Sequence, residues 1–142
     1  MEKKSEYCSC LYYTANALAR NMTRLAEAAF ASTGLAPSYA FLVMSINKSP
    51  GQQAGELAEI MMLSPSTITR LIEKLEQKGL VKRVTEGRST LVFPTAASVA
   101  LNEQIKTAWS GLYQKYADIL GDEAALNLTA QTYEAAVKLE KE

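Results

Sequence analysis

SPSTITRLIEKLEQK, residues Ser64–Lys78, is the stretch that decides the fold. Ser64 suits a helix N-cap, and Pro65 suits the first helical position, where a missing N–H costs nothing. Gly79 follows the stretch, and glycine is the residue best suited to the left-handed conformation after a helix. These signals predict one short helix with both ends marked.

The predicted helix has an apolar face and a polar face. Its apolar residues fall at i, i+3, i+4 and i+7, and they are Ile68, Leu71, Ile72 and Leu75. The opposite face carries hydroxyls, an amide and cations, namely Ser66, Thr67, Arg70, Lys74 and Gln77. A helix of this kind suits entry into a DNA major groove. An ordinary surface helix shows the same pattern, so the flanking sequence has to decide.

Bulk composition fits one globular domain with an uneven charge distribution. The chain has 142 residues, 48% of them hydrophobic and 21% charged, which excludes a disordered chain. The net charge is zero, but Ser64–Ser89 contains six cations and three carboxylates, so this segment carries +3 and the remainder −3. A local basic face is what contact with phosphates requires.

A helix-turn-helix followed by a wing is predicted around the opening stretch. Residues 37–47 form an almost wholly apolar helix, residues 52–61 form a short helix, and Met62–Ser64 connect it to the helix above. Residues 80–84 and 91–93 are β-prone and flank a polar loop at 85–90, which predicts a hairpin. This order favours a winged helix-turn-helix much more strongly than any single element does.

Long helices with apolar stripes are predicted on both sides of this region, at residues 7–31, 96–120 and about 123–140. The stripes exceed what a small monomer covers easily, so we expect a symmetric homodimer. The fold class is mainly α with a small β-hairpin wing (α+β). The expected divisions are an N-terminal dimerisation helix (1–36), the winged helix-turn-helix (37–95) and C-terminal dimerisation helices (96–142), within one domain overall.

The segment from Leu57 to Arg83, followed by Glu86-Gly87-Arg88 and Leu91–Thr95, resembles the MarR family of winged helix-turn-helix transcriptional regulators. Glu86 stands where the family usually has Asp, and Pro94 stands where it tends to have Leu. The resemblance implies a dimeric, sequence-specific DNA-binding regulator, typically a repressor of a palindromic operator that a ligand or an oxidant releases.

Candidate DNA-contacting residues follow from side-chain chemistry. Ser66, Thr67 and Arg70 are expected to reach base edges, because arginine makes bidentate contacts with guanine. Thr69, Lys74, Gln52 and Gln53 are expected to contact phosphates. Arg88 at the wing tip is expected to enter or flank the minor groove, with Glu86 supporting it through a salt bridge. For each residue the alternative is a solvated surface side chain.

A sensing site is expected from the resemblance. Its ligand crevice would involve Tyr12, Tyr13, Asn16, Tyr39 and Trp109. Each of these aromatic residues alone also suits a core position. Cys8 and Cys10 are candidate redox residues, but residues two apart on a helix diverge by about 200°, so a direct disulfide would require an unwound helix start.

Other function classes are disfavoured. The chain has no histidine and two cysteines, no phosphate-binding glycine loop and no recognisable carboxylate pair, so an enzyme, a bound metal and a cofactor are not expected. No targeting segment is visible, so we expect a cytoplasmic protein with reduced thiols. The competing hypothesis is a winged-helix module that binds protein; the local +3 charge favours DNA.

Overall fold

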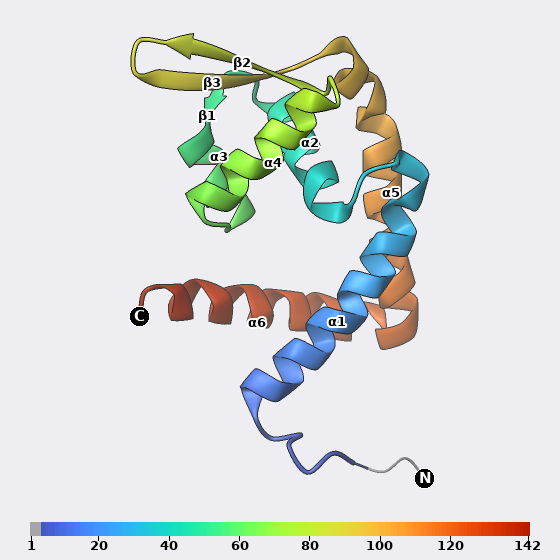
Figure 1. The fold of residues 1–142 in the computed structure, drawn as a ribbon. Helices are drawn as coiled ribbons and strands as arrows, with labels where there is room; N and C mark the ends of the chain where they lie inside the picture. The colour runs from blue at the N-terminus through green and yellow to red at the C-terminus, as the bar shows by residue number, and fades with distance from the viewer. Residues whose placement is uncertain (1–3) are drawn as a thin grey trace. The chain divides into compact units, whose positions relative to one another are not determined.

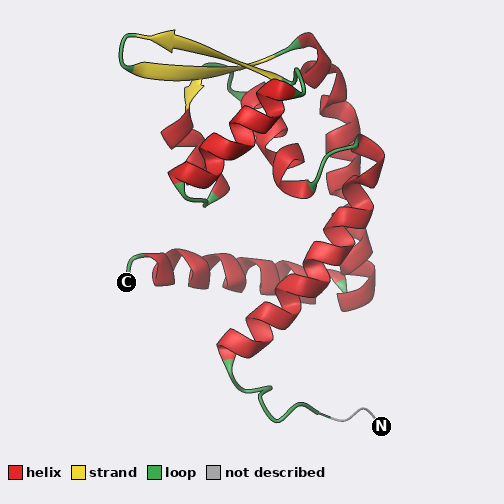
Figure 2. Cartoon of the chain, in the orientation of Figure 1, coloured by secondary structure: helices red, strands yellow, loops and turns green. Residues whose placement is uncertain are grey.

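A computed structural model of the chain describes residues 4–142. It is mainly helical with one small sheet (Figures 1 and 2). In chain order the elements are α1 (Leu11–Phe30), the 3-10 turn η1 (Ala31–Thr33), α2 (Pro37–Lys48), β1 (Gln52–Gln53), α3 (Ala54–Met61), α4 (Pro65–Gln77), β2 (Val81–Glu86), β3 (Ser89–Pro94), α5 (Ala96–Leu120) and α6 (Asp122–Glu140). The α+β class and the winged helix-turn-helix order are as predicted.

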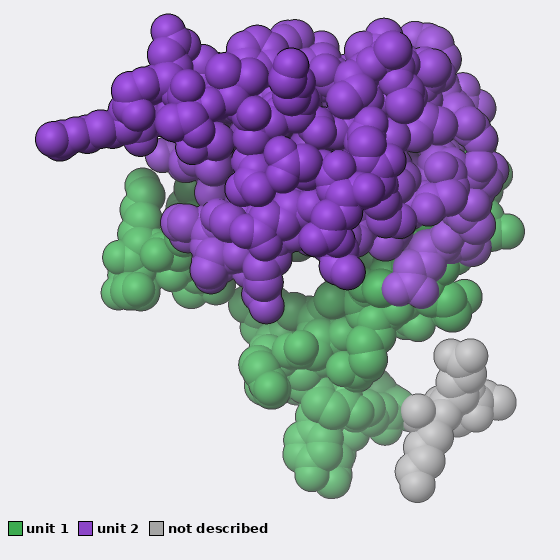
Figure 3. Space-filling view, turned by 45° about the horizontal axis from the view of Figure 1, so that its top comes forward, with its two compact units in different colours: residues 1–26, 110–142 green, residues 27–109 purple. Residues whose placement is uncertain are grey.

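The chain divides into two compact units, which Figure 3 shows in different colours. One unit holds residues 1–26 and 110–142, and the other holds residues 27–109. The second unit contains the entire helix-turn-helix and wing. These bounds fall inside α1 and α5, so they separate the two parts of the chain that are compact in themselves. The predicted division at residues 36 and 95, between dimerisation helices and a DNA-binding region, stays a prediction.

The sheet has three antiparallel strands in the order β1-β3-β2. Six residue pairs join β2 to β3, from Val81 with Pro94 at the base to Glu86 with Ser89 at the tip. Only Gly87 and Arg88 remain in the turn, and Gly87 has φ +62°. Glycine at the first central position suits a two-residue hairpin turn. The strands are therefore longer, and the loop shorter, than the predicted 85–90.

The start of one predicted helix belongs to the sheet. Residues 52–61 were predicted as one helix, but Gln52 and Gln53 form β1 and pair with Val92 and Leu91 of β3. The helix begins only at Ala54. Gly51, at φ +87°, directs the chain into this pairing, and its N–H donates to the Val92 carbonyl at 2.9 Å. A partner 40 residues away thus overrides the local helical pattern.

The first helix also begins later than predicted. It was expected from residue 7, whereas α1 starts at Leu11. Before it, the Cys8 N–H donates to the Ser5 carbonyl and the Cys10 N–H to the Tyr7 carbonyl, which are short turns rather than helical bonds. Both cysteines therefore precede the helix, and their side chains are not held apart by helical geometry.

Buried apolar side chains form the core of the 27–109 unit, and the largest of them come from six elements. The largest are Phe30, Leu42, Ile46, Leu57, Ile68, Ile72, Leu75, Val92 and Ile105, each 1% exposed or less. Three of them come from α4, which places its apolar face inside the unit. Within residues 4–142, no single helix has both the length and the apolar composition to span a membrane; Leu11–Thr33 and Pro37–Lys48 pass that test only as a pair bent by 59°.

Replacing Ile72 with alanine should test this anchoring. Ile72 is 1% exposed, so Ile72→Ala should lower the free energy of unfolding by about 2–5 kcal/mol, through lost burial and the cavity left behind. Urea unfolding followed by circular dichroism measures the change. The matched control is Ile60→Ala on α3, because Ile60 is 55% exposed and should change stability by less than about 0.5 kcal/mol. An equal decrease in the free energy of unfolding for both variants would contradict the burial of Ile72.

Candidate nucleic-acid interface

The N-terminus of α4 is capped as the sequence predicts. The Ser64 hydroxyl oxygen accepts a hydrogen bond from the Thr67 backbone N–H at 3.2 Å, and Pro65 is the first helical residue. The Ser64 and Thr67 hydroxyls are also 2.8 Å apart. This network satisfies a free donor of the first turn and fixes where the helix begins.

The two faces of α4 differ in burial as well as in chemistry. Ile68, Ile72 and Leu75 are buried, whereas Ser66, Arg70 and Lys74 are exposed. Within residues 4–142, neither Arg70 nor Lys74 forms an ion pair. Thr69 is exposed, but its hydroxyl donates to the Pro65 carbonyl at 2.9 Å and so has only acceptor capacity left. The helix therefore presents two unneutralised cations from a rigidly packed base.

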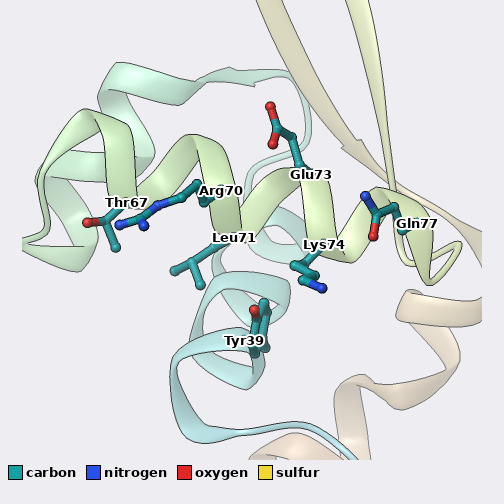
Figure 4. Close-up of a pocket in the computed structure, with 7 residues that line it drawn as sticks. All are labelled: Tyr39, Thr67, Arg70, Leu71, Glu73, Lys74 and Gln77. Carbon is teal, nitrogen blue, oxygen red and sulfur yellow. The ribbon is translucent and has the colours of Figure 1, made fainter.

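A groove of about 360 Å³ runs along one side of α4 (Figure 4). Its lining consists of Tyr39 from α2 together with Thr67, Arg70, Leu71, Glu73, Lys74 and Gln77 from α4. Tyr39 rises from α2 toward Leu71 and Lys74, while Glu73 points to the other side of α4. The groove thus joins one predicted sensing residue to three predicted DNA-contacting residues.

The wing is tied to α4 by an ion pair at its base. Arg83 of β2 donates to the Glu76 carboxylate from Nη2 at 2.7 Å and from Nε at 3.2 Å. The hydrogen bond from Arg83 lowers the pKa of the Glu76 carboxyl below its usual value, and the same bond raises the pKa of Arg83. At the far end, Arg88 is exposed in the hairpin turn.

Glu86 and Arg88 were predicted to form a supporting salt bridge. Within the described chain, no ion pair joins them; Glu86 lies opposite Ser89 at the end of the hairpin. The ion pair that sequence reasoning missed is Glu76–Arg83. The sequence does contain a signal for this ion pair. Glu76 lies near the end of α4 and Arg83 near the start of β2, and the short turn at Gly79 between them brings the two side chains together.

The two glutamines predicted to contact phosphates, Gln52 and Gln53, differ in burial and in hydrogen bonding. Gln53 is exposed at the junction of β1 and α3, its backbone N–H donates to the Glu56 carboxylate at 3.0 Å, and its amide donates to the Ser89 hydroxyl at 3.2 Å. The carboxamide oxygen of Gln52 is buried and has no hydrogen-bond partner in the described chain. Gln53 therefore braces the sheet against α3 while remaining accessible.

The predicted sensing residues are divided between the two units. In the first unit, Tyr12 is 80% exposed, Tyr13 packs against Tyr7 with ring centroids 5.4 Å apart, and the Asn16 amide donates to the Tyr12 carbonyl at 2.7 Å. In the second unit, Trp109 meets Phe41 edge-on at 5.8 Å, and Tyr39 lines the groove on α4. The crevice remains a prediction.

The cysteines and the acidic residues show no assembled site in the part of the chain that the structure describes. Cys8 and Cys10 are both free and exposed. No group of three or more cysteine, aspartate or glutamate side chains in residues 4–142 is arranged to hold a metal ion.

The sequence model of the MarR family matches residues 36–86, which cover α2 to the end of β2. Over these residues the chain is similar to the MarR family.

Similar proteins extend this likeness beyond the matched segment. The HTH-type transcriptional repressor MdtR of Bacillus subtilis (strain 168) is 26% identical over 115 residues, which cover 77% of this chain and 74% of MdtR. The S. aureus MepR–DNA complex has a TM-score of 0.78 at 15% identity, covering 96% of this chain and 99% of that one. CouR of Rhodococcus jostii RHA1, bound to p-coumaroyl-CoA, has a TM-score of 0.74 at 24% identity, covering 93% and 96%. The two structures show that the MarR fold extends along nearly the whole chain.

The Glu76–Arg83 ion pair predicts a pH-dependent contribution to stability. The folded pKa of Glu76 lies below its ordinary value of 4.5, so the stabilisation is present above pH 4.5 and is lost as the pH falls through the folded pKa. Glu76→Gln should therefore lower Tm at pH 7, and the gap to the wild type should close as the pH falls below 4.5.

Thermal unfolding between pH 7 and pH 3 measures this gap. The control is Glu103→Gln, because Glu103 is 89% exposed and its carboxylate lies 3.9 Å from Lys106. That variant should have a Tm close to the wild-type value at neutral pH. A Glu76→Gln gap that persists unchanged at pH 3 would contradict an ionic origin.

Proposed function

We propose that the protein is a dimeric repressor that binds an inverted-repeat operator and is released by a small-molecule or oxidative signal. The observation that carries this proposal is the outward face of α4, where exposed Arg70 and Lys74 stand on a helix whose other face is buried. Cations that lack partners within residues 4–142 are available to phosphates and bases.

Each contact has a chemical reason. Ser66 and Thr67 lie in the first turn of α4, the part of a recognition helix that reaches base edges first, and Arg70 lies one turn further on. Lys74 and Thr69 contact phosphates, with Thr69 as an acceptor for a water bridge. Gln53 reaches a phosphate beside α3. Arg88 at the wing tip flanks the minor groove, where its charge is attracted to the phosphates on both sides.

Exposed apolar side chains in the unit of residues 1–26 and 110–142 support the homodimer. They include Leu11, Ile119, Leu126, Tyr133 and Leu139, each more than half exposed. Large apolar surfaces of this kind mark interfaces with other chains. A second copy is the partner that a symmetric operator requires, because two-fold symmetry presents two α4 helices about 34 Å apart.

The signal acts through the residues outside the DNA-binding face. CouR binds p-coumaroyl-CoA, which supports an organic effector for this chain as well. The proposed effector contacts are Tyr12, Tyr13, Asn16, Tyr39 and Trp109. Cys8 and Cys10 offer an oxidative route, because both thiols are exposed ahead of α1. We place this regulator in the cytoplasm, with the DNA.

Selection of bound duplexes from a random-sequence library tests the proposed function. The account predicts an enriched inverted repeat with half-site centres about 10 base pairs apart, and binding that weakens steeply with added salt. Recovery of no preferred sequence, with weak binding of every duplex, would contradict it and favour a module that binds protein.

Arg70→Ala should weaken binding to the selected duplex by about 1–3 kcal/mol and relax base preference at one position of each half-site. Fluorescence anisotropy on the selected duplex and its single-base variants measures both effects. Lys106→Ala on α5 is the control, since it also removes one exposed cation and should leave affinity within about twofold. Wild-type affinity for Arg70→Ala would contradict the assignment.

Leu126→Glu should break the dimer. Leu126 is 58% exposed, and burying a leucine is worth about 1.5–3 kcal/mol, so two symmetric copies should raise the dimer Kd roughly 10²- to 10⁴-fold. Analytical ultracentrifugation measures this shift. Gln131→Glu is the control, because it adds the same charge to α6 about 140° around the helix. Retention of the dimer by Leu126→Glu would exclude Leu126 from the interface.

A further inference from the structure

The groove between α2 and α4 has a lining unlike that of a pocket for an apolar ligand. Tyr39 and Leu71 are its aromatic and aliphatic side chains, and the other five carry a polar or charged group on a partly apolar stem. Pockets for small organic molecules are lined mainly by hydrophobic and aromatic side chains and enclose most of the ligand. The groove is open and lies on the outward side of α4, and five of its seven lining residues carry polar or charged groups, so it suits a polar chain that passes by.

The charges along the groove favour an anion on the side of Tyr39. Arg70 and Lys74 contribute two positive charges, and neither has an ion-pair partner within residues 4–142. Glu73 contributes one negative charge but points to the other side of α4 (Figure 4). Lys74 and Tyr39 therefore face the same space, and the two cations of the lining outnumber its single carboxylate.

The dimensions of DNA identify what lies in that space when α4 is bound. A helix with its side chains is about 10–12 Å across, and the major groove is about 12 Å wide. A recognition helix consequently fills the groove, and the elements beside it face the two phosphate backbones that form the walls. The wing lies on one side of α4 and Tyr39 of α2 on another.

We propose that this groove receives a backbone phosphate of the bound duplex, and that Tyr39 is a DNA-contacting residue. Its phenol O–H donates to a non-bridging phosphate oxygen, and Lys74 neutralises the same phosphate. The inference rests on the proposed function, and it assigns to Tyr39 a role in DNA binding instead of effector binding. Tyrosine hydroxyls are common donors to phosphates.

Tyr39→Phe removes only the donor and tests the proposal. On the selected duplex it should bind about 3- to 10-fold more weakly than the wild type, with an unchanged salt slope, because a neutral group releases no counterion. Lys74→Ala should reduce that slope by about one. Tyr7→Phe is the control: Tyr7 is 56% exposed ahead of α1, and its variant should bind as the wild type does.

Duplexes with single neutral methylphosphonates locate the contact. At one position in each half-site, the substitution should weaken wild-type binding about 3- to 10-fold more than it weakens Tyr39→Phe, because the variant keeps the Lys74 contact but has already lost the hydrogen bond. Wild-type affinity for Tyr39→Phe, or equal losses for both proteins at every position, would overturn the phosphate contact and return Tyr39 to the effector crevice. Failure of the wild type to bind the selected duplex would instead overturn the proposed function, and thermal unfolding confirms that each variant is folded.

Discussion

Burial of the Ile68, Ile72 and Leu75 face of α4 is the constraint on which the rest of the structure depends. A 13-residue helix is marginally stable alone in water, so packing rather than propensity holds it. Once that face is buried, the side chains on the opposite face of the helix point toward solvent. The position of Arg70 and Lys74 is therefore a consequence of core packing, and the Ser64 cap fixes where the first turn begins.

The wing and the ends of the neighbouring helices hold this helix in a defined frame. The Thr95 hydroxyl donates to the Gly79 carbonyl at 2.8 Å, which joins the end of α4 to the start of α5 across the base of the hairpin. Arg83 and Glu76 join the same end of α4 to β2. Both contacts are partly exposed and individually modest. Together they orient the wing relative to α4, and the proposed DNA contacts depend on that orientation.

The helices and the hairpin could be predicted from sequence because their signals are local: caps, apolar spacing and turn residues. The failures share one physical cause. The strand at Gln52 exists only because β3 offers it a partner, and the groove at Tyr39 exists only because α2 and α4 pack together. The pairing of Glu76 with Arg83 likewise depends on how the hairpin leaves the helix. Contacts between distant segments leave little trace in local periodicity.

The central claim is that α4 lies in the major groove with its first turns toward the bases. Site-specific photocrosslinking tests it most directly, with a benzophenone amino acid in place of exposed Ser66 in the protein bound to its selected duplex. The account predicts crosslinks to bases within each half-site, and none from the same group in place of Gln131 on α6. Crosslinks from position 66 that reach only protein, or DNA outside the half-sites, would contradict it.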